Sequence, residues 1–133
     1  MFIYVFGNED VQKDNIALKV SQALRGVIGG VRFVCVKPNE DLPFSEGENV
    51  VIMDAVYGLT SVALLSLDDP DSLTLPPRTS THDFDLGFQL KYLKKLGRIG
   101  KVKLIGLPMK GSVDYSRVQL ILRKLVAQDM QGS

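Results

Sequence analysis

Phe2-Ile3-Tyr4-Val5-Phe6 is an unbroken run of apolar, β-branched and aromatic residues that ends at Gly7-Asn8. A run without alternating polar positions predicts a strand that is buried on both faces, and it places this strand in the interior of a sheet. Val50-Val51-Ile52-Met53 has the same character and ends at Asp54. Two interior strands of this kind are typical of a parallel sheet covered by helices.

The rest of the chain alternates between strand and helix patterns. Further strands are predicted at 31–36 and 101–107, while 62–67 fits either an edge strand or part of a helix. Helical spacing of apolar residues predicts three helices, from Asp14 to Gly26, from the Thr79–Asp83 segment to Gly97, and from Asp114 to about Gln128. Inward positions are Ile16, Ala17, Val20, Ala23 and Leu24 in the first helix, and Val118, Ile121, Leu122 and Leu125 in the last.

This alternation predicts an α/β fold, a three-layer sandwich with a mostly parallel, twisted five-stranded sheet and helices on both faces. Residues 1–133 are expected to form a single domain, since a chain of this length can bury one core without a metal or disulfides. Right-handed crossovers favour the strand order 2-1-3-4-5, with strands one and three side by side. Such sheets bind ligands in the crevice at the carboxyl ends of those two strands.

Composition excludes several classes of protein. With 16 basic and 15 acidic residues the net charge is +1, which gives no reason to expect nucleic acid or an anionic membrane as partner. The single cysteine, Cys35, excludes a disulfide framework and is expected to be buried and inert. No apolar stretch approaches the roughly 20 residues that span a bilayer, and Phe2–Phe6 lacks the features of a secretory signal. We therefore expect a cytoplasmic protein.

Asp14, Asp54 and His82 are the candidate site residues. Asp14 follows the first strand, Asp54 is expected directly after the third, and His82 precedes the helix that leads to the last strand. In the predicted topology all three lie at one end of the sheet. Two carboxylates and one imidazole suit a divalent ion such as nickel or zinc with open coordination positions, and they also suit acid-base chemistry.

Each residue also has a structural explanation. Asp14 could interact with the positive end of a helix dipole, Asp54 could cap the next backbone turn, and His82 could be a helix cap. Seven bases without an acid follow between 91 and 110. They form either a solvated surface or a region that steers an acidic partner.

The order of these motifs resembles the nickel-iron hydrogenase maturation endopeptidases. The family opens with a strand, a Gly-Asn and a carboxylate at the start of a helix, which Gly7-Asn8 and Asp14 match. An apolar strand ending in Asp-Ala with a nearby Gly is matched by 51–55 and Gly58. A Ser/Thr-Ser/Thr-His segment, an amphipathic helix, a basic linker and a strand ending in Gly are matched by Ser80-Thr81-His82, the helix to Gly97, and 102–106.

The resemblance implies an endopeptidase that removes the C-terminal extension of the hydrogenase large-subunit precursor after nickel insertion. It implies that Asp14, Asp54 and His82 contact nickel, and that the nickel is carried by the substrate subunit. Asp14 and Asp54 are the candidate catalytic residues, either of which could activate water as general base. In an alternative assignment the substrate's own metal polarises the carbonyl and this protein contributes recognition only.

Two other hypotheses remain. The chain could be a binding module that docks on a nickel-loaded metalloprotein subunit without cutting it. It could also be a small-molecule enzyme of flavodoxin-like topology, against which stands the missing phosphate-loop motif. The sequence does not indicate the oligomeric state.

Overall fold

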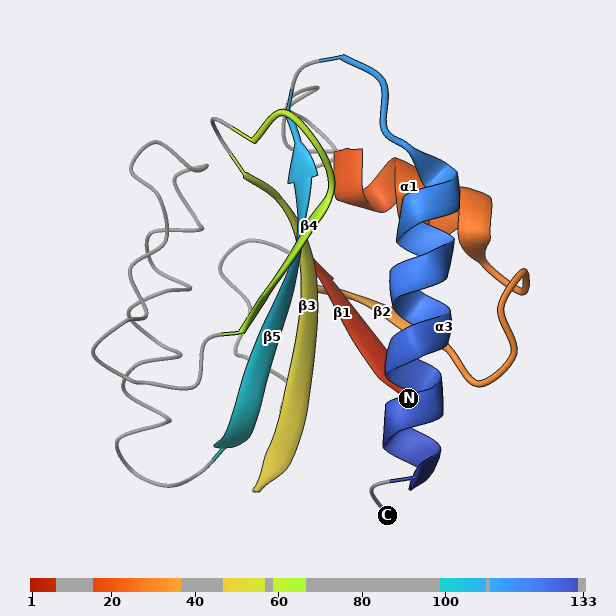
Figure 1. Ribbon diagram of the computed structural model, residues 1–133, viewed down its shortest axis with the longest axis vertical. Helices are drawn as coiled ribbons and strands as arrows, with labels where there is room; N and C mark the ends of the chain where they lie inside the picture. Colours follow the sequence, from red (N-terminus) through yellow and green to blue (C-terminus); the bar gives the residue numbers. More distant parts are fainter. Residues whose placement is uncertain (7–15, 37–46, 57–58, 67–98, 110, 132–133) are drawn as a thin grey trace.

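The structure is a computed structural model that describes residues 1–6, 16–36, 47–56, 59–66, 99–109 and 111–131. These residues form a five-stranded sheet and two helices (Figure 1). In chain order the elements are β1 (Phe2–Phe6), α1 (Ile16–Leu24), β2 (Arg32–Val36), β3 (Glu48–Val56), β4 (Ala63–Ser66), β5 (Ile99–Pro108) and α3 (Tyr115–Gln131). The predicted α/β class and the mostly parallel sheet are confirmed.

The strand order is β2-β1-β3-β5-β4, so the predicted order 2-1-3-4-5 is wrong at one edge. Strands β1 and β3 do lie side by side, and β1, β2, β3 and β5 are parallel. The short segment at 63–66 is an edge strand that runs antiparallel to β5. Burial explains this arrangement: from Leu104 to Pro108 β5 is buried on both faces, which suits an interior strand, whereas three of the four β4 residues are exposed.

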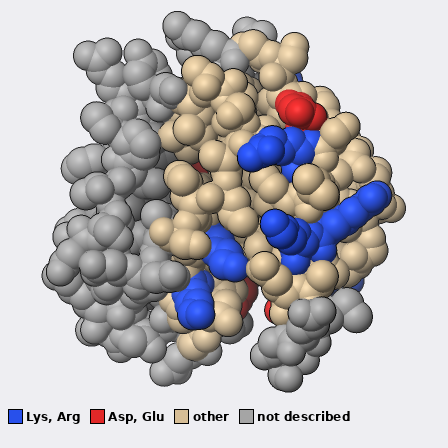
Figure 2. All heavy atoms as spheres, viewed as in Figure 1, with Lys and Arg blue, Asp and Glu red and all other residues tan. Residues whose placement is uncertain are grey.

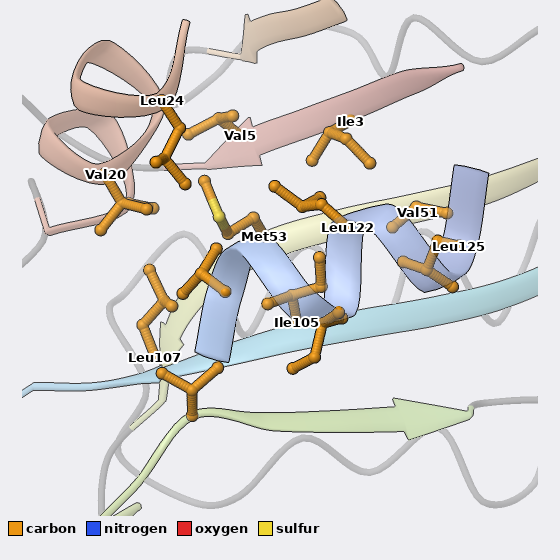
Figure 3. Packing of buried hydrophobic residues seen from close by; sticks show 14 of the residues in the cluster. Ile3, Val5, Val20, Leu24, Val51, Met53, Ile105, Leu107, Leu122 and Leu125 are labelled. Atoms are coloured by element: carbon orange, nitrogen blue, oxygen red, sulfur yellow. The ribbon is translucent and has the colours of Figure 1, made fainter. Parts of the chain in front are cut away.

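Both described helices pack on one face of the sheet, which we call the helix face. There Val20 and Leu24 of α1, and Leu122 of α3, lie against Ile3 and Met53 (Figure 3). The four inward residues predicted for α3, Val118, Ile121, Leu122 and Leu125, are all buried. One inward position of α1 is wrong.

In α1 the exposed residue is Ala23, and Ser21 is buried in its place. The Ser21 hydroxyl donates a hydrogen bond of 2.8 Å to the backbone oxygen of Leu18. Because this bond satisfies the hydroxyl within its own helix, the polar side chain can face the core at little cost.

The opposite face, called here the second face, carries a separate apolar cluster. Its buried members are Tyr4, Phe6, Val36, Val50, Ile52, Val56, Val102 and Leu104. The helix predicted between Thr79 and Gly97 lies outside the described residues. The expectation of helices on both faces therefore stays a prediction.

Asp114 caps the start of α3, and Arg117 links the helix to the sheet edge. Its Oδ1 accepts a hydrogen bond of 3.1 Å from the backbone nitrogen of Arg117, which is the geometry of an N-cap. The Arg117 guanidinium donates from Nε to the backbone oxygen of Val62, at 2.9 Å, just before β4.

Neither α1 nor α3, the helices of the described part, is long and apolar enough to cross a membrane.

Candidate functional site

Asp54 lies inside β3, two residues before the strand ends at Val56. The sequence placed it directly after the strand, and that detail is wrong. Ala55 and Val56 continue the pairing with β5, opposite Leu107 and Pro108. The side-chain period of two puts Asp54 on the second face together with Ile52 and Val56. Asp54 nevertheless lies near the carboxyl-terminal end of an interior strand, as the sequence predicted.

The Asp54 side chain is only 5% exposed. Its Oδ1 accepts a hydrogen bond of 2.9 Å from the backbone nitrogen of Ala55. This bond agrees with the structural explanation in which Asp54 caps its own backbone. A buried carboxylate in an apolar strand is costly to the fold, and such groups are concentrated at functional sites.

The neighbour of Asp54 on β5 is Gly106, and the lack of a side chain there matters. A Cβ at Gly106 would lie 2.7 Å from Leu59 Cδ1 and 3.3 Å from Val56 Cγ2. The Leu59 backbone nitrogen donates a hydrogen bond of 3.4 Å to the backbone oxygen of Val56, the last residue of β3. Leu59 therefore fills the space that any larger residue at 106 would need. The sequence did not identify Leu59 as part of this region.

Strand β1 ends beside Asp54. The pairs Tyr4–Ile52 and Val5–Met53 fix the register of β1 on β3, so continuation of the ladder brings Phe6 to the level of Asp54. The chain thus leaves β1 next to the carboxylate, as expected for a ligand crevice at these two strand ends. Residues 7–15, which include Asp14, lie outside the described residues.

His82 also lies outside the described part. The structure therefore places one of the three predicted site residues, and the convergence of Asp14, Asp54 and His82 remains a prediction. Within the described residues no three His, Cys, Asp or Glu side chains come together as a metal site would require.

The sequence did not predict a hydrogen-bonded pair of polar side chains, Tyr4 and Glu48, on the second face. The Tyr4 hydroxyl donates a hydrogen bond of 2.6 Å to Glu48 Oε2, across from β1 to the start of β3. Burial raises the pKa of Tyr4, and the hydrogen bond and the negative charge of Glu48 raise it further. Glu48 lies at the opposite end of β3 from Asp54, so this pair is not part of the candidate site.

Cys35 is exposed, contrary to the expectation that it is buried. It lies on β2, which is an edge of the sheet, and α1 and α3 do not cover it there. The run from Val31 to Val36 indicated a strand correctly but could not show that this strand lies at an edge of the sheet.

No protein-family model and no curated protein matches the chain. Solved structures with a similar fold include hydrogenase maturating endopeptidase HybD from Escherichia coli, with TM-score 0.64 and 18% identity over 99% of this chain and 94% of that one. The nickel-iron hydrogenase maturation protease HybD from Thermococcus kodakarensis gives 0.62 and 21%, over 94% and 98%. Hydrogenase 2 maturation peptidase from a Thaumarchaeota archaeon gives 0.53 and 19%, over 97% of each chain. The chain shares the fold of these proteins over nearly its whole length.

Proposed function

We propose that this protein is an endopeptidase that removes the C-terminal extension of the large subunit of a nickel-iron hydrogenase after nickel insertion. The observation that carries the proposal is the buried Asp54 carboxylate near the end of β3, beside the end of β1, in a fold shared with hydrogenase maturation proteases. The sequence motifs around Asp14 and His82 support the same assignment.

In this proposal Asp14, Asp54 and His82 hold the nickel of the substrate subunit. Two carboxylate oxygens and an imidazole nitrogen are suitable ligands for such an ion and leave positions for its existing ligands. Binding the metal fixes the adjacent peptide bond against the protein, which lowers the entropic part of the barrier. Asp14 or Asp54 then acts as general base for the attacking water. The peptide C–N bond breaks, and the new carboxyl and amino termini take up the elements of water.

The test is incubation of the protein with purified large-subunit precursor, with and without nickel, followed by intact-mass measurement. We expect loss of a C-terminal peptide only from the nickel-loaded precursor, and no loss with Asp54→Asn. The amide keeps the shape of the carboxylate but cannot act as a base. Asp114→Asn is the matched control, because Asp114 is exposed and asparagine is an equally good N-cap.

Two results would contradict the proposal. Cleavage that persists in Asp54→Asn, with the variant folded by circular dichroism, would remove Asp54 from the mechanism. A stable complex with unchanged precursor mass would instead identify a binding module that checks nickel loading without cutting.

A further inference from the structure

A strip of basic residues runs along the helix face, between α3 and the edge of the sheet. We define this basic strip as Arg117 and Lys124 of α3 and Lys101 and Lys103 of β5. Arg117, Lys124 and Lys101 are exposed, and Lys103 is half-buried. Figure 2 shows Lys and Arg side chains gathered on this face of the molecule, over α3 and β5.

Two hydrogen bonds show that one flank of α3 faces this edge. Arg117 Nε donates to the backbone oxygen of Val62, and Lys103 Nζ donates to Gln128 Oε1 at 3.3 Å. Lys124 lies between Arg117 and Gln128 on the same flank, since residues seven and four apart on a helix share a side. Lys103 lies between Val102 and Leu104 of the second face, so it lies on the helix face. The register of β5 on β3 is irregular between Ile99 and Val102, and Lys101 is placed on the same side by the cavity that it lines with Leu125 and Gln128.

The four cations of the strip outnumber the acids near it in the described part of the chain. The Arg117 and Lys103 side chains donate hydrogen bonds to neutral oxygens, of Val62 and Gln128. Of the described acids near α3, Asp114 caps the helix backbone, and Asp129 lines a cavity together with Lys101 and Lys103. With four cations to these two acids among the described residues, the surface attracts an anionic partner, and the attraction is strongest at low salt.

The strip leads into a cavity of about 550 Å³ between α3 and the amino-terminal ends of β3 and β5. Its lining includes Lys101, Lys103, Gln128 and Asp129, with Leu125, Val51 and Asn49 as uncharged surface. Beside the strip, Leu64 of β4 is 37% exposed and pairs with Ile105, a residue of the helix face. The surface therefore combines separated positive charges with an apolar contact and a hollow large enough for side chains.

We propose that the basic strip, together with this cavity, docks an acidic, extended segment of a partner protein. Arg117 and Lys124 are seven residues apart on α3, about 10 Å along the axis, and Lys101 and Lys103 are about 7 Å apart along β5. An extended segment with acidic side chains on one side presents charges at the latter spacing. The net charge of +1 and the single tyrosine on α3 disfavour nucleic acid, which needs a strongly basic surface and stacking aromatics. The inference applies equally to a protease and to a binding module.

Fluorescence anisotropy with the full chain tests this directly. The probe is a labelled 12-residue peptide of alternating Glu and Ser, and the matched probe carries Gln in place of each Glu. We expect saturable binding of the acidic peptide at low salt, weakened by added salt, and little binding of the Gln peptide. Lys103→Glu with Lys124→Glu should weaken binding about tenfold. Each substitution removes one attraction to the acidic peptide and introduces one repulsion, and exposed charge pairs are individually weak.

Lys19→Glu with Arg32→Glu is the matched control. It makes the same change in net charge, but Lys19 lies exposed on α1 and Arg32 exposed on β2, the sheet edge opposite β4. Affinity within twofold of the unmodified chain is expected for this pair. Amide chemical-shift changes in the unmodified protein provide a second measurement, and they should concentrate at 101–103 and 117–128.

Four results would overturn the inference. Three concern affinity: equal losses of affinity in the two double variants, equal binding of the Glu and Gln peptides, and tighter binding of a single-stranded oligonucleotide of the same charge. Amide shifts confined to other parts of the molecule would do the same.

Discussion

Asp54 of β3 lies directly opposite Gly106 of β5 in the parallel ladder. Because Gly106 has no side chain, Leu59 occupies the space over that part of β5, on the face that carries Asp54. The surroundings of the candidate catalytic carboxylate thus depend on a residue that contributes no side-chain chemistry.

Gly106→Ala should destabilise the protein by about 1–3 kcal/mol, the usual cost of overpacking a buried site. The added Cβ would meet Leu59 Cδ1 at 2.7 Å and Val56 Cγ2 at 3.3 Å. Urea unfolding measures the change. The double variant Gly106→Ala with Leu59→Ala should lose less stability than the sum of the losses in the two single variants, because the shortened side chain at 59 leaves room for the added Cβ. Gly29→Ala, where a Cβ meets nothing within 4 Å, is the control and should change stability by less than about 0.5 kcal/mol.

Tyr4→Phe should alter the alkaline limb of the stability curve. The raised pKa of Tyr4 means that the folded chain keeps a proton that the unfolded chain releases above its ordinary pKa of about 10. The stabilisation is complete below that value and is lost as pH rises through the folded pKa. Between about pH 9 and pH 11 the unmodified chain should therefore lose stability faster than Tyr4→Phe. Urea unfolding at each pH tests this, and parallel curves would contradict it.

Asp114→Ala should cost about 1 kcal/mol, because the first turn of α3 loses the acceptor for the Arg117 backbone nitrogen. Asp114→Asn should restore most of this loss. Thermal unfolding followed at 222 nm compares the two variants. Ser116→Ala tests the specificity of the effect, since Ser116 is exposed in the same turn and is not the cap.

Leu122→Ala should cost about 2–5 kcal/mol, because Leu122 is fully buried where α3 meets the strands (Figure 3). Leu120→Ala removes the same atoms from the same helix, but Leu120 is 64% exposed. Its effect should stay below about 0.5 kcal/mol. Similar losses in both variants would mean that helix propensity, rather than burial, determines the contribution of α3.

His82→Ala should abolish nickel-dependent recognition of the precursor while leaving the unfolding transition almost unchanged. The reason is the predicted ligand role of His82 in a loop, where a side chain adds little to the core. Pull-down of nickel-loaded and nickel-free precursor, beside a thermal melt of the variant, checks both parts. Collapse of the melt would point instead to a structural histidine.

The interior of the fold could be predicted from local patterns. The apolar runs at Phe2–Phe6 and Val50–Met53 indicated strands buried on both faces, and helical spacing gave all four inward residues of α3. The edges of the sheet could not be predicted in this way. Which strand lies outermost depends on pairing between distant segments. The predicted order of β4 and β5 and the predicted burial of Cys35 were therefore both wrong.

The candidate site was predicted only in part for a related reason. An aspartate after four apolar residues resembles a strand end, although the ladder to β5 holds the strand through Val56. The Tyr4–Glu48 hydrogen bond joins residues 44 positions apart, and no local pattern reports such a contact. The roles of Asp14 and His82 still depend on sequence motifs alone.

The long ladder between β3 and β5 also has a consequence for how the chain reaches its native state. Paired residues such as Asp54 and Gly106 are about fifty positions apart in the sequence. The chain therefore loses the entropy of closing a large loop before the contacts between the two strands stabilise it. During synthesis, one side of the apolar β3 stays without its neighbour until the ribosome has passed Pro108, a delay of several seconds at about 5–20 residues per second. We therefore expect slow refolding and a need for chaperone protection of the nascent chain.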